Sequence, residues 1–127
     1  MGLFQQGDFR LHSGSKSWFK IECGYLSDDD WRAIARLVAE QLDFKDAIGI
    51  PSGGLKLAEA LKFYRKNTDR LPTLIVDDVL TTGASMEKER LKIAGRSIGI
   101  VLFARGKCPS WVWPVFEMKM QPIQRRK

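Results

Sequence analysis

Hydrophobic residues recur along the chain in patterns that predict one long helix and several short buried segments. Between residues 27 and 42 they follow the spacing of a single helix face. The residues of this apolar stripe are Trp31, Ile34, Ala35, Val38 and Leu42. Ser27 precedes the stripe as a typical N-cap, and Asp30, three residues later, can complete a capping box. We therefore predict an amphipathic helix that starts after Ser27.

Farther along, short apolar runs alternate with segments of helical spacing. Gly95 stands where glycine commonly ends a helix. Strands and helices in alternation are typical of a parallel, doubly wound sheet with helices on both faces. The predicted fold class is therefore α/β, with four or five strands in the sheet. The expected strands are 46–51, 74–76 and 97–104, and the expected helices are 55–66 and 85–94.

Two segments flank this α/β core, which we place at residues 25–105. The opening segment, 1–24, alternates on both sides of a Ser-Gly-Ser break, which predicts a hairpin or strand pair. The C-terminal segment, 106–127, carries several aromatic residues. A length of 127 residues suits one domain, and no repeat or linker divides it, so we expect residues 1–127 to form a single domain.

Composition narrows the class of protein. Hydrophobic residues make up 44% of the chain and charged residues 28%, as in ordinary globular proteins. No apolar run approaches the roughly 20 residues of a membrane-spanning helix, and the N-terminus lacks the layout of a signal peptide. Cys23 and Cys108 show neither zinc-binding spacing nor a disulfide framework. We therefore expect a cytoplasmic protein with reduced thiols and no membrane partner.

The net charge of +6 has more than one interpretation. It can indicate nucleic-acid binding, which depends on neutralising phosphates. It can equally suit a small polyanionic ligand, or serve solubility alone. Basic residues gather in 62–70 and at the C-terminus, 125–127, but no zinc finger, aromatic RNA-binding signature or basic zipper accompanies them. A nucleic-acid partner is therefore disfavoured.

The most informative stretch is 73–86, where an apolar run ends in two adjacent acids, Asp77 and Asp78. A turn with hydroxyl groups and a glycine follows, and then a segment that can be helical. The first N–H groups of a helix lack partners and point outward, so such a turn is suited to an anion. Carboxylates beside a phosphate-binding loop suit a ligand that carries both hydroxyls and phosphate. A sugar phosphate is the first expectation.

Two other segments are expected at the same edge of the sheet. In parallel sheets, ligands bind beyond the carboxyl ends of the strands. The segment 51–54, rich in glycine, and the basic segment 105–107 both follow predicted strands. The familiar G-x-x-x-x-G-K-[ST] and G-x-G-x-x-G phosphate motifs are absent from the sequence. A nucleoside triphosphatase or dinucleotide-binding function is accordingly disfavoured.

Residues 75–85, Ile-Val-Asp-Asp-Val-Leu-Thr-Thr-Gly-Ala-Ser, resemble the phosphoribosyl-pyrophosphate (PRPP) signature of type I phosphoribosyltransferases. Residues 7–17 and 21–24 resemble the opening segment of the orotate phosphoribosyltransferases within that family. Residues 49–54, Gly-Ile-Pro-Ser-Gly-Gly, are similar to the family's pyrophosphate loop. The resemblance spans most of residues 7–105, with the three segments in the family's order.

The resemblance implies a reaction and a role for each segment. Pyrophosphate at the ribose C1 of PRPP would be displaced by a nucleobase nitrogen, with Mg²⁺ carried in by PRPP and its waters near Asp77 and Asp78. These two acids would hold the ribose hydroxyls. The 5-phosphate would be bound by Thr81, Thr82, Gly83, Ala84 and Ser85. The pyrophosphate would meet Ser52, Gly53 and Gly54. Candidate nucleobase contacts are His12, Lys20 and Arg105.

Each assignment has a purely structural alternative. Asp77 and Asp78 can be surface acids after a strand, and 52–54 can be no more than a tight turn. His12 can be a surface residue of the hairpin, and Arg105 a solvated strand end. The aromatic residues of the C-terminal segment can stack on a base or, as we favour, pack at the sheet edge or in a dimer surface; they are Trp111, Trp113 and Phe116.

One departure from the orotate enzymes bears on activity. Their long mobile loop would fall within 55–72, which here has room for one helix and a short turn. We therefore expect a shortened form that lacks this catalytic loop. Three hypotheses remain: a Mg²⁺-dependent phosphoribosyltransferase, a non-catalytic module that binds PRPP or a nucleotide, and a nucleic-acid-associated protein. The family resemblance also implies a homodimer.

Overall fold

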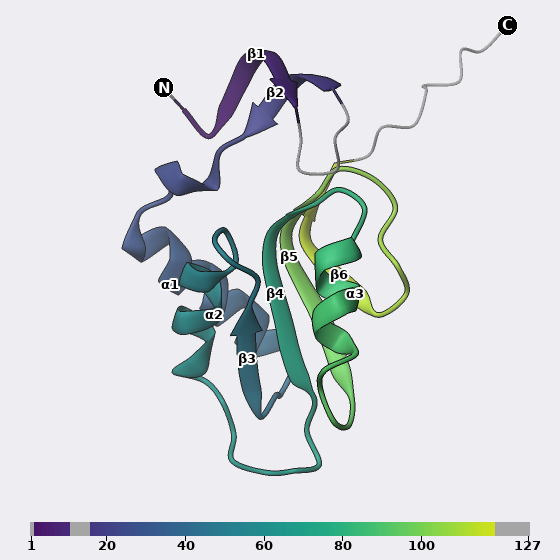
Figure 1. Ribbon diagram of the computed structural model, residues 1–127. Coiled ribbons are helices and arrows are strands. Elements are labelled where there is room, and N and C mark those ends of the chain that lie inside the picture. The colour runs from purple at the N-terminus through teal and green to yellow at the C-terminus, as the bar shows by residue number, and fades with distance from the viewer. Residues whose placement is uncertain (1, 11–15, 119–127) are drawn as a thin grey trace, which may run out of the picture.

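The computed structural model describes residues 2–10 and 16–118. Its elements follow one another along the chain as an opening hairpin and then an α/β core (Figure 1). In order they are β1 (Phe4–Arg10), β2 (Lys16–Ile21), a 3₁₀ turn (Cys23–Tyr25), α1 (Asp28–Gln41), β3 (Asp46–Gly49), α2 (Leu55–Lys62), β4 (Thr73–Leu80), α3 (Ala84–Arg90), β5 (Ser97–Ala104) and β6 (Val112–Glu117).

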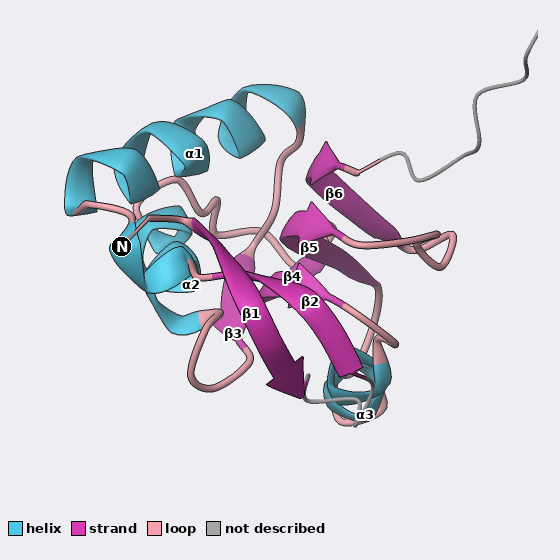
Figure 2. Cartoon of the chain, turned by 90° about the horizontal axis from the view of Figure 1, so that it is seen from above, coloured by secondary structure: helices cyan, strands magenta, loops and turns pink. Residues whose placement is uncertain are grey.

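The core is a four-stranded sheet in the order β3-β4-β5-β6, and every neighbouring pair is parallel. Strands β1 and β2 pair antiparallel in a separate two-stranded sheet. Seen from above, this hairpin lies over the carboxyl ends of the core strands (Figure 2). The parallel α/β architecture and the opening hairpin are as the sequence predicts.

Helices cover both faces of the sheet, as β4 illustrates. Leu74 and Val76 belong to one buried cluster with residues of α1 and α2. Ile75, between them, belongs to a second cluster with Met86 of α3. Because side chains alternate across a strand, these clusters lie on opposite faces. Figure 2 shows the same division, with α1 and α2 on one side of the sheet and α3 on the other.

Helix α1 begins as the capping pattern predicts. Asp30 N donates to Ser27 Oγ over 3.1 Å, and Ser27 N donates to Asp30 Oδ2 over 2.8 Å. This capping box satisfies two donors that the first helical turn would otherwise leave unpaired. The apolar stripe faces inward, with Trp31, Ile34 and Val38 at most 8% exposed.

Helices α2 and α3 are shorter than their patterns predict. After Lys62 the chain turns away from the helix axis, and Lys66 N donates to Phe44 O over 2.9 Å while Lys66 Nζ pairs with Asp43. After Arg90 two tight turns follow, and Gly95 has a φ of +86°. Contacts with the neighbouring loop end the first helix, and tight turns end the second, before the apolar spacing stops.

Strand β6 is the element that the sequence left open. It pairs with β5 from Gly99 opposite Val112 to Ala104 opposite Glu117 and forms the edge of the sheet. The C-terminal aromatic segment therefore packs at the sheet edge, as favoured. Among the helices within residues 2–10 and 16–118, none is long and apolar enough to cross a membrane.

Candidate functional site

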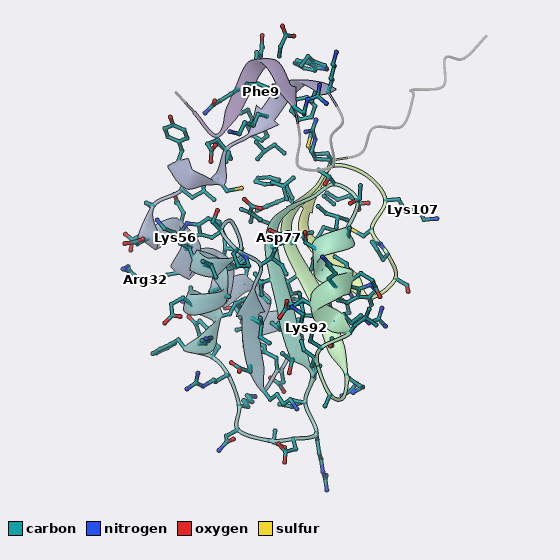
Figure 3. The ribbon with its side chains drawn as sticks, viewed as in Figure 1. Phe9, Arg32, Lys56, Asp77, Lys92 and Lys107 are labelled. Carbon is teal, nitrogen blue, oxygen red and sulfur yellow. The ribbon has the colours of Figure 1, made fainter. Side chains whose placement is uncertain are left out.

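The site is built where the carboxyl ends of β3, β4 and β5 meet beneath the hairpin. Asp77 lies in this upper part of the sheet (Figure 3). Both acids lie inside β4, which continues to Leu80, rather than after a strand that ends at residue 76. The parallel register places Asp77 opposite Val101 of β5. Pairing with β5 therefore fixes the backbone at Asp77, while the pairing of β4 with β3 ends one residue earlier, at Val76.

The loop at 51–54 is pressed against these acids. Ile50 N donates to Val76 O over 2.8 Å, and Gly54 N donates to Ile50 O over the same distance. A Cβ added at Gly54 would collide with Val76 O, and one at Gly53 would collide with the Asp78 carboxylate. The Pro51-Ser52 peptide bond is cis. Backbone packing therefore requires a glycine at 54, whereas at 53 the colliding group is a side chain, and the structure brings together the 51–54 and 77–78 segments that the sequence singled out.

The acid pair is partly withdrawn from water. Asp77 Oδ1 accepts from Asp78 N over 2.9 Å, and Asp78 Oδ1 accepts from Val79 N over 2.8 Å. Burial, together with a hydrogen bond from the Asp78 side chain, raises the pKa of Asp77 to about 7. Burial and the negative charge of Asp78 also raise the pKa of the nearby Cys23 thiol to about 12. The thiol is therefore neutral, and Asp77 changes charge near neutral pH.

The loop at 81–85 joins β4 to α3 and is held at both ends. Leu80 and Met86 are buried, at 2% and 1% exposure, whereas Thr81, Thr82 and Ser85 are exposed. Gly83 adopts a φ of +82°, a left-handed conformation that suits glycine. Ala84 N lies 3.4 Å from Thr82 Oγ1, its hydrogen-bond acceptor. The three hydroxyl residues of this loop are thus exposed at the end of the sheet that carries the acids.

Arg105 follows β5 and connects the core to the hairpin. Its Nη2 donates to Ser17 Oγ over 2.7 Å, and its guanidinium lies 3.8 Å from the centroid of the Phe19 ring. Arg105 N also donates to Leu80 O over 3.2 Å. A second contact joins the same parts, since Phe4 meets Phe103 edge to face with centroids 5.9 Å apart. Sequence reasoning identified Arg105 but missed its partners in β2.

A cleft of about 720 Å³ opens beside Arg105, between it and the hairpin. Three cationic side chains and one acidic side chain line it, together with three aromatic rings. The lining residues are Asp8, Phe9, Arg10, Lys16, Ser17, Trp18, Phe19 and Arg105. The cleft is therefore cationic and aromatic, which suits a flat anionic ring.

Lys20, another of the predicted base contacts, does not line this cleft. Lys20 pairs with Glu22 over 2.9 Å, and its Nζ lies 6.0 Å from the centroid of the Phe9 ring. His12 lies outside the described residues. Within residues 2–10 and 16–118, no three His, Cys, Asp or Glu side chains come together as a metal site. The two carboxylates of Asp77 and Asp78 are compatible with a Mg²⁺ ion whose other ligands are phosphate oxygens and water.

Comparison with protein-family models and with curated protein sequences finds no match. Solved structures do match. Orotate phosphoribosyltransferase from Aeropyrum pernix aligns with a TM-score of 0.72 and 25% identity, over 91% of this chain and 88% of that one. The Mycobacterium tuberculosis H37Rv enzyme of the same name aligns at 0.64 and 16%, over 91% and 89%. UMP synthase from Leishmania donovani aligns at 0.69 and 20%, over 91% of this chain and 34% of that one.

The chain has the type I phosphoribosyltransferase fold. It is a short form of that fold. Residues 63–72, between α2 and β4, pass along the bottom of the sheet, whereas the acid pair lies toward its top (Figure 1). In the described part of the chain, the α2–β4 connection therefore contributes no cover to the acids. The expected absence of a long loop in this position agrees with the structure.

Proposed function

We propose that the protein is a phosphoribosyltransferase, which transfers phosphoribose from PRPP to a nucleobase and releases pyrophosphate. The observation that carries this proposal is the packing of the 51–54 loop against Asp78 and Val76. A glycine loop, an acid pair and an exposed hydroxyl-rich loop then share one edge of the sheet. The fold of the orotate phosphoribosyltransferases named above supports the same reaction class.

Each segment takes one part of PRPP in this proposal. Asp77 and Asp78 accept hydrogen bonds from the ribose hydroxyls, and residues 81–85 donate to the 5-phosphate. Ser52, Gly53 and Gly54 receive the pyrophosphate, and the close packing of the two glycines sets this loop beside the acid pair. Mg²⁺ bound to PRPP would neutralise phosphate charge beside Asp77 and Asp78.

The chemical step is a displacement at the ribose C1. A ring nitrogen of the base forms the new bond to C1 while the bond from C1 to the pyrophosphate oxygen breaks, and the bonding electrons leave with pyrophosphate. The ribose gains positive charge in the transition state, so carboxylates held beneath it stabilise that state. Fixed placement of both reactants supplies a further part of the acceleration.

The acceptor base is assigned to the cleft beside Arg105. Three cations against one acid favour an acidic base, such as orotate, over a neutral purine. Arg105 already contacts Ser17 and Phe19, so we assign it to holding the cleft wall as well as to attracting the base. Contacts from Lys20 and His12 stay predictions, as do the homodimer and the cytoplasmic location.

A second function, non-catalytic binding of PRPP or a nucleotide, is favoured by one observation. The connection between α2 and β4 runs along the far edge of the sheet, away from the acids. A closing lid would exclude water and raise the transfer rate. Binding of PRPP needs no such cover, so it is common to both functions.

Calorimetry with PRPP and Mg²⁺ tests the shared part. We expect binding by the wild type and a loss of at least about tenfold in affinity for Asp78→Asn, because a neutral amide holds a hydroxyl more weakly than a carboxylate. Asp69→Asn, at an exposed position, is the matched control. Absence of binding, or equal binding by all three proteins, contradicts both functions.

Turnover separates the two. Pyrophosphate release is measured with PRPP, Mg²⁺ and each of orotate, uracil, adenine, hypoxanthine, guanine and xanthine. The proposed transferase releases pyrophosphate with at least one base, and orotate is expected to be the best. Binding of PRPP without release for any base supports the binding module instead.

A further inference from the structure

A second cleft, of about 700 Å³ and here called the back cleft, lies toward the amino ends of the strands, whereas the acids lie toward their carboxyl ends. It is formed where α3 ends and β5 begins, so the length of β5 separates it from Arg105. Lys92, in the turn that borders it, is labelled below Asp77 in Figure 3. This back cleft belongs to no part of the proposed phosphoribosyl site.

Two arginines supply positive charge to the back cleft. Arg90 lies with its guanidinium 4.6 Å from the centroid of the Trp111 ring and contacts Glu87 over 3.4 Å. Arg96 donates from Nη2 to the carbonyl of Arg70 over 3.0 Å. These contacts orient both side chains. A guanidinium has five N–H donors, so such contacts are compatible with a paired hydrogen bond to an incoming carboxylate or phosphate.

Polar atoms without partners lie in the same region. Ser97 Oγ, from a residue that lines the cleft, is buried and has no hydrogen-bond partner among the described residues. The same holds for Nε1 of Trp111, the ring on which Arg90 stacks. A buried hydroxyl or indole N–H without a partner is unfavourable, so this part of the fold carries an unmet hydrogen-bonding demand beside the cleft.

Glu87 also lines the cleft, where it pairs with Arg90, and most of the remaining wall is apolar. Ile93 and Ile98 line it, and Leu91 stands at its mouth with 81% of its surface exposed. An inorganic anion would leave these side chains in water, whereas an organic anion covers them and gains from the burial. Charge at one part of the cleft and apolar surface at another therefore select an amphipathic ligand.

We propose that the back cleft is a binding site for a small organic anion, in which a carboxylate or phosphate group meets Arg90 and Arg96 and an apolar body lies against Leu91 and Ile93. The cleft requires neither PRPP nor turnover, so this site stands independently of the proposed transferase function.

The test is a titration of the full chain followed by amide and indole N–H NMR shifts. Phenyl phosphate and phenylacetate are the two anionic probes, and benzyl alcohol is the neutral analogue of the same ring size. We expect both anions to shift Ser97, Ile98 and the Trp111 indole, and benzyl alcohol to shift them at least fivefold more weakly. Whichever anion binds more tightly identifies a phosphate or a carboxylate as the preferred group.

Variants then test the contacts. Arg96→Gln is expected to weaken the anion at least fivefold. Leu91→Glu changes an exposed residue, so folding is retained while negative charge at the mouth repels the probe by a similar factor. Arg32→Gln, on the exposed face of α1, is the matched control and should bind as the wild type does.

Three results would overturn the site. Equal shifts with benzyl alcohol would show that the cleft binds apolar groups without regard to charge. Shifts confined to Gly53 and Gly83 would place the probe only at the acid edge, the end of the sheet that carries Asp77, Asp78 and the loops at 51–54 and 81–85. Unchanged affinity in Leu91→Glu and Arg96→Gln would show that the anion binds elsewhere. Because shifts at the acid edge are read separately, failure of the transferase proposal and failure of this one are distinguishable.

Discussion

The acid edge and the hairpin are attached to the core in different ways. At the acid edge, backbone meets backbone: Gly54 packs against Val76 O, and Ile50 N donates to the same carbonyl. The hairpin instead rests on side chains, chiefly Arg105 on Ser17 and Phe19, and Phe4 on Phe103. At the end of β2, Ile21 also belongs to the buried core cluster, so the two regions differ in the kind of contact and not in whether they join the core. We therefore expect larger losses of stability from substitutions at the backbone contacts than from substitutions at the side-chain contacts.

The largest effect is expected for Gly54→Ala. The new Cβ would meet Val76 O and lie 2.8 Å from Ile50 N, and neither backbone atom can move without shifting a strand. We expect a loss of about 3 kcal/mol of unfolding free energy, the upper part of the range for overpacking. Urea unfolding measures the loss. Gly106→Ala is the control because its Cβ meets no atom within 4 Å, and an equal loss in both variants would contradict the packing argument.

Gly53→Ala sharpens the comparison within the acid edge. Here the Cβ would displace the Asp78 carboxylate, a side chain that can rotate, so the fold is expected to survive. Affinity for PRPP should fall about tenfold or more, because the displaced carboxylate no longer reaches the ribose. Calorimetry measures the affinity, and circular dichroism confirms folding. Binding equal to that of the wild type would separate this loop from the ligand.

Arg105→Ala tests the hairpin side. Loss of the Ser17 hydrogen bond and of stacking on Phe19 is expected to reduce stability by about 1 kcal/mol. Hydrogen exchange should accelerate in β1 and β2 while β4 stays protected. Arg105→Lys keeps the charge without the flat stacking surface, and partial rescue is expected. Faster exchange throughout the sheet would contradict this, because it would show that the Arg105 contacts stabilise the whole fold.

The smallest effect is a pH dependence that originates at Asp77. Its pKa of about 7 in the folded protein exceeds the ordinary value of 3.8. Between these values the folded state binds more protons than the unfolded state, so this contribution to stability is lost as pH rises through about 7. PRPP affinity should change in the opposite direction, because the ionised carboxylate is the better acceptor for ribose hydroxyls.

Asp77→Asn should flatten both trends, whereas Asp69→Asn should leave them unchanged. Thermal unfolding at pH 5.5 and pH 8, and calorimetry with PRPP at the same values, provide the two measurements. Wild-type trends that persist in Asp77→Asn would assign the titration to another group.

The same contrast explains what the sequence could and could not predict. Helix α1 and the 75–85 segment are encoded by neighbouring residues, through the Ser27 capping box and the run from Asp77 into the loop. Arg105 and Ser17 lie 88 positions apart, and no local pattern links them. Strand β6 was left open because its short aromatic pattern also suited a base-stacking role. The back cleft is lined by residues between Glu87 and Ile98, but hydrophobic periodicity predicts helices and strands and not the hollow between them.

One residue of β6 bears on how the molecule avoids adding strands to its sheet. Gly99 N donates to Trp111 O. Because the backbone N–H and C=O groups of a strand alternate in direction, those of the odd-numbered residues of β6 point toward β5. The backbone groups of Pro114 point away from β5. Proline has no N–H, so a strand arriving at this edge would meet a missing donor in the middle of the ladder. Pro114 thereby protects the open side of the sheet from edge-to-edge aggregation, and Pro114→Val is expected to remove that protection.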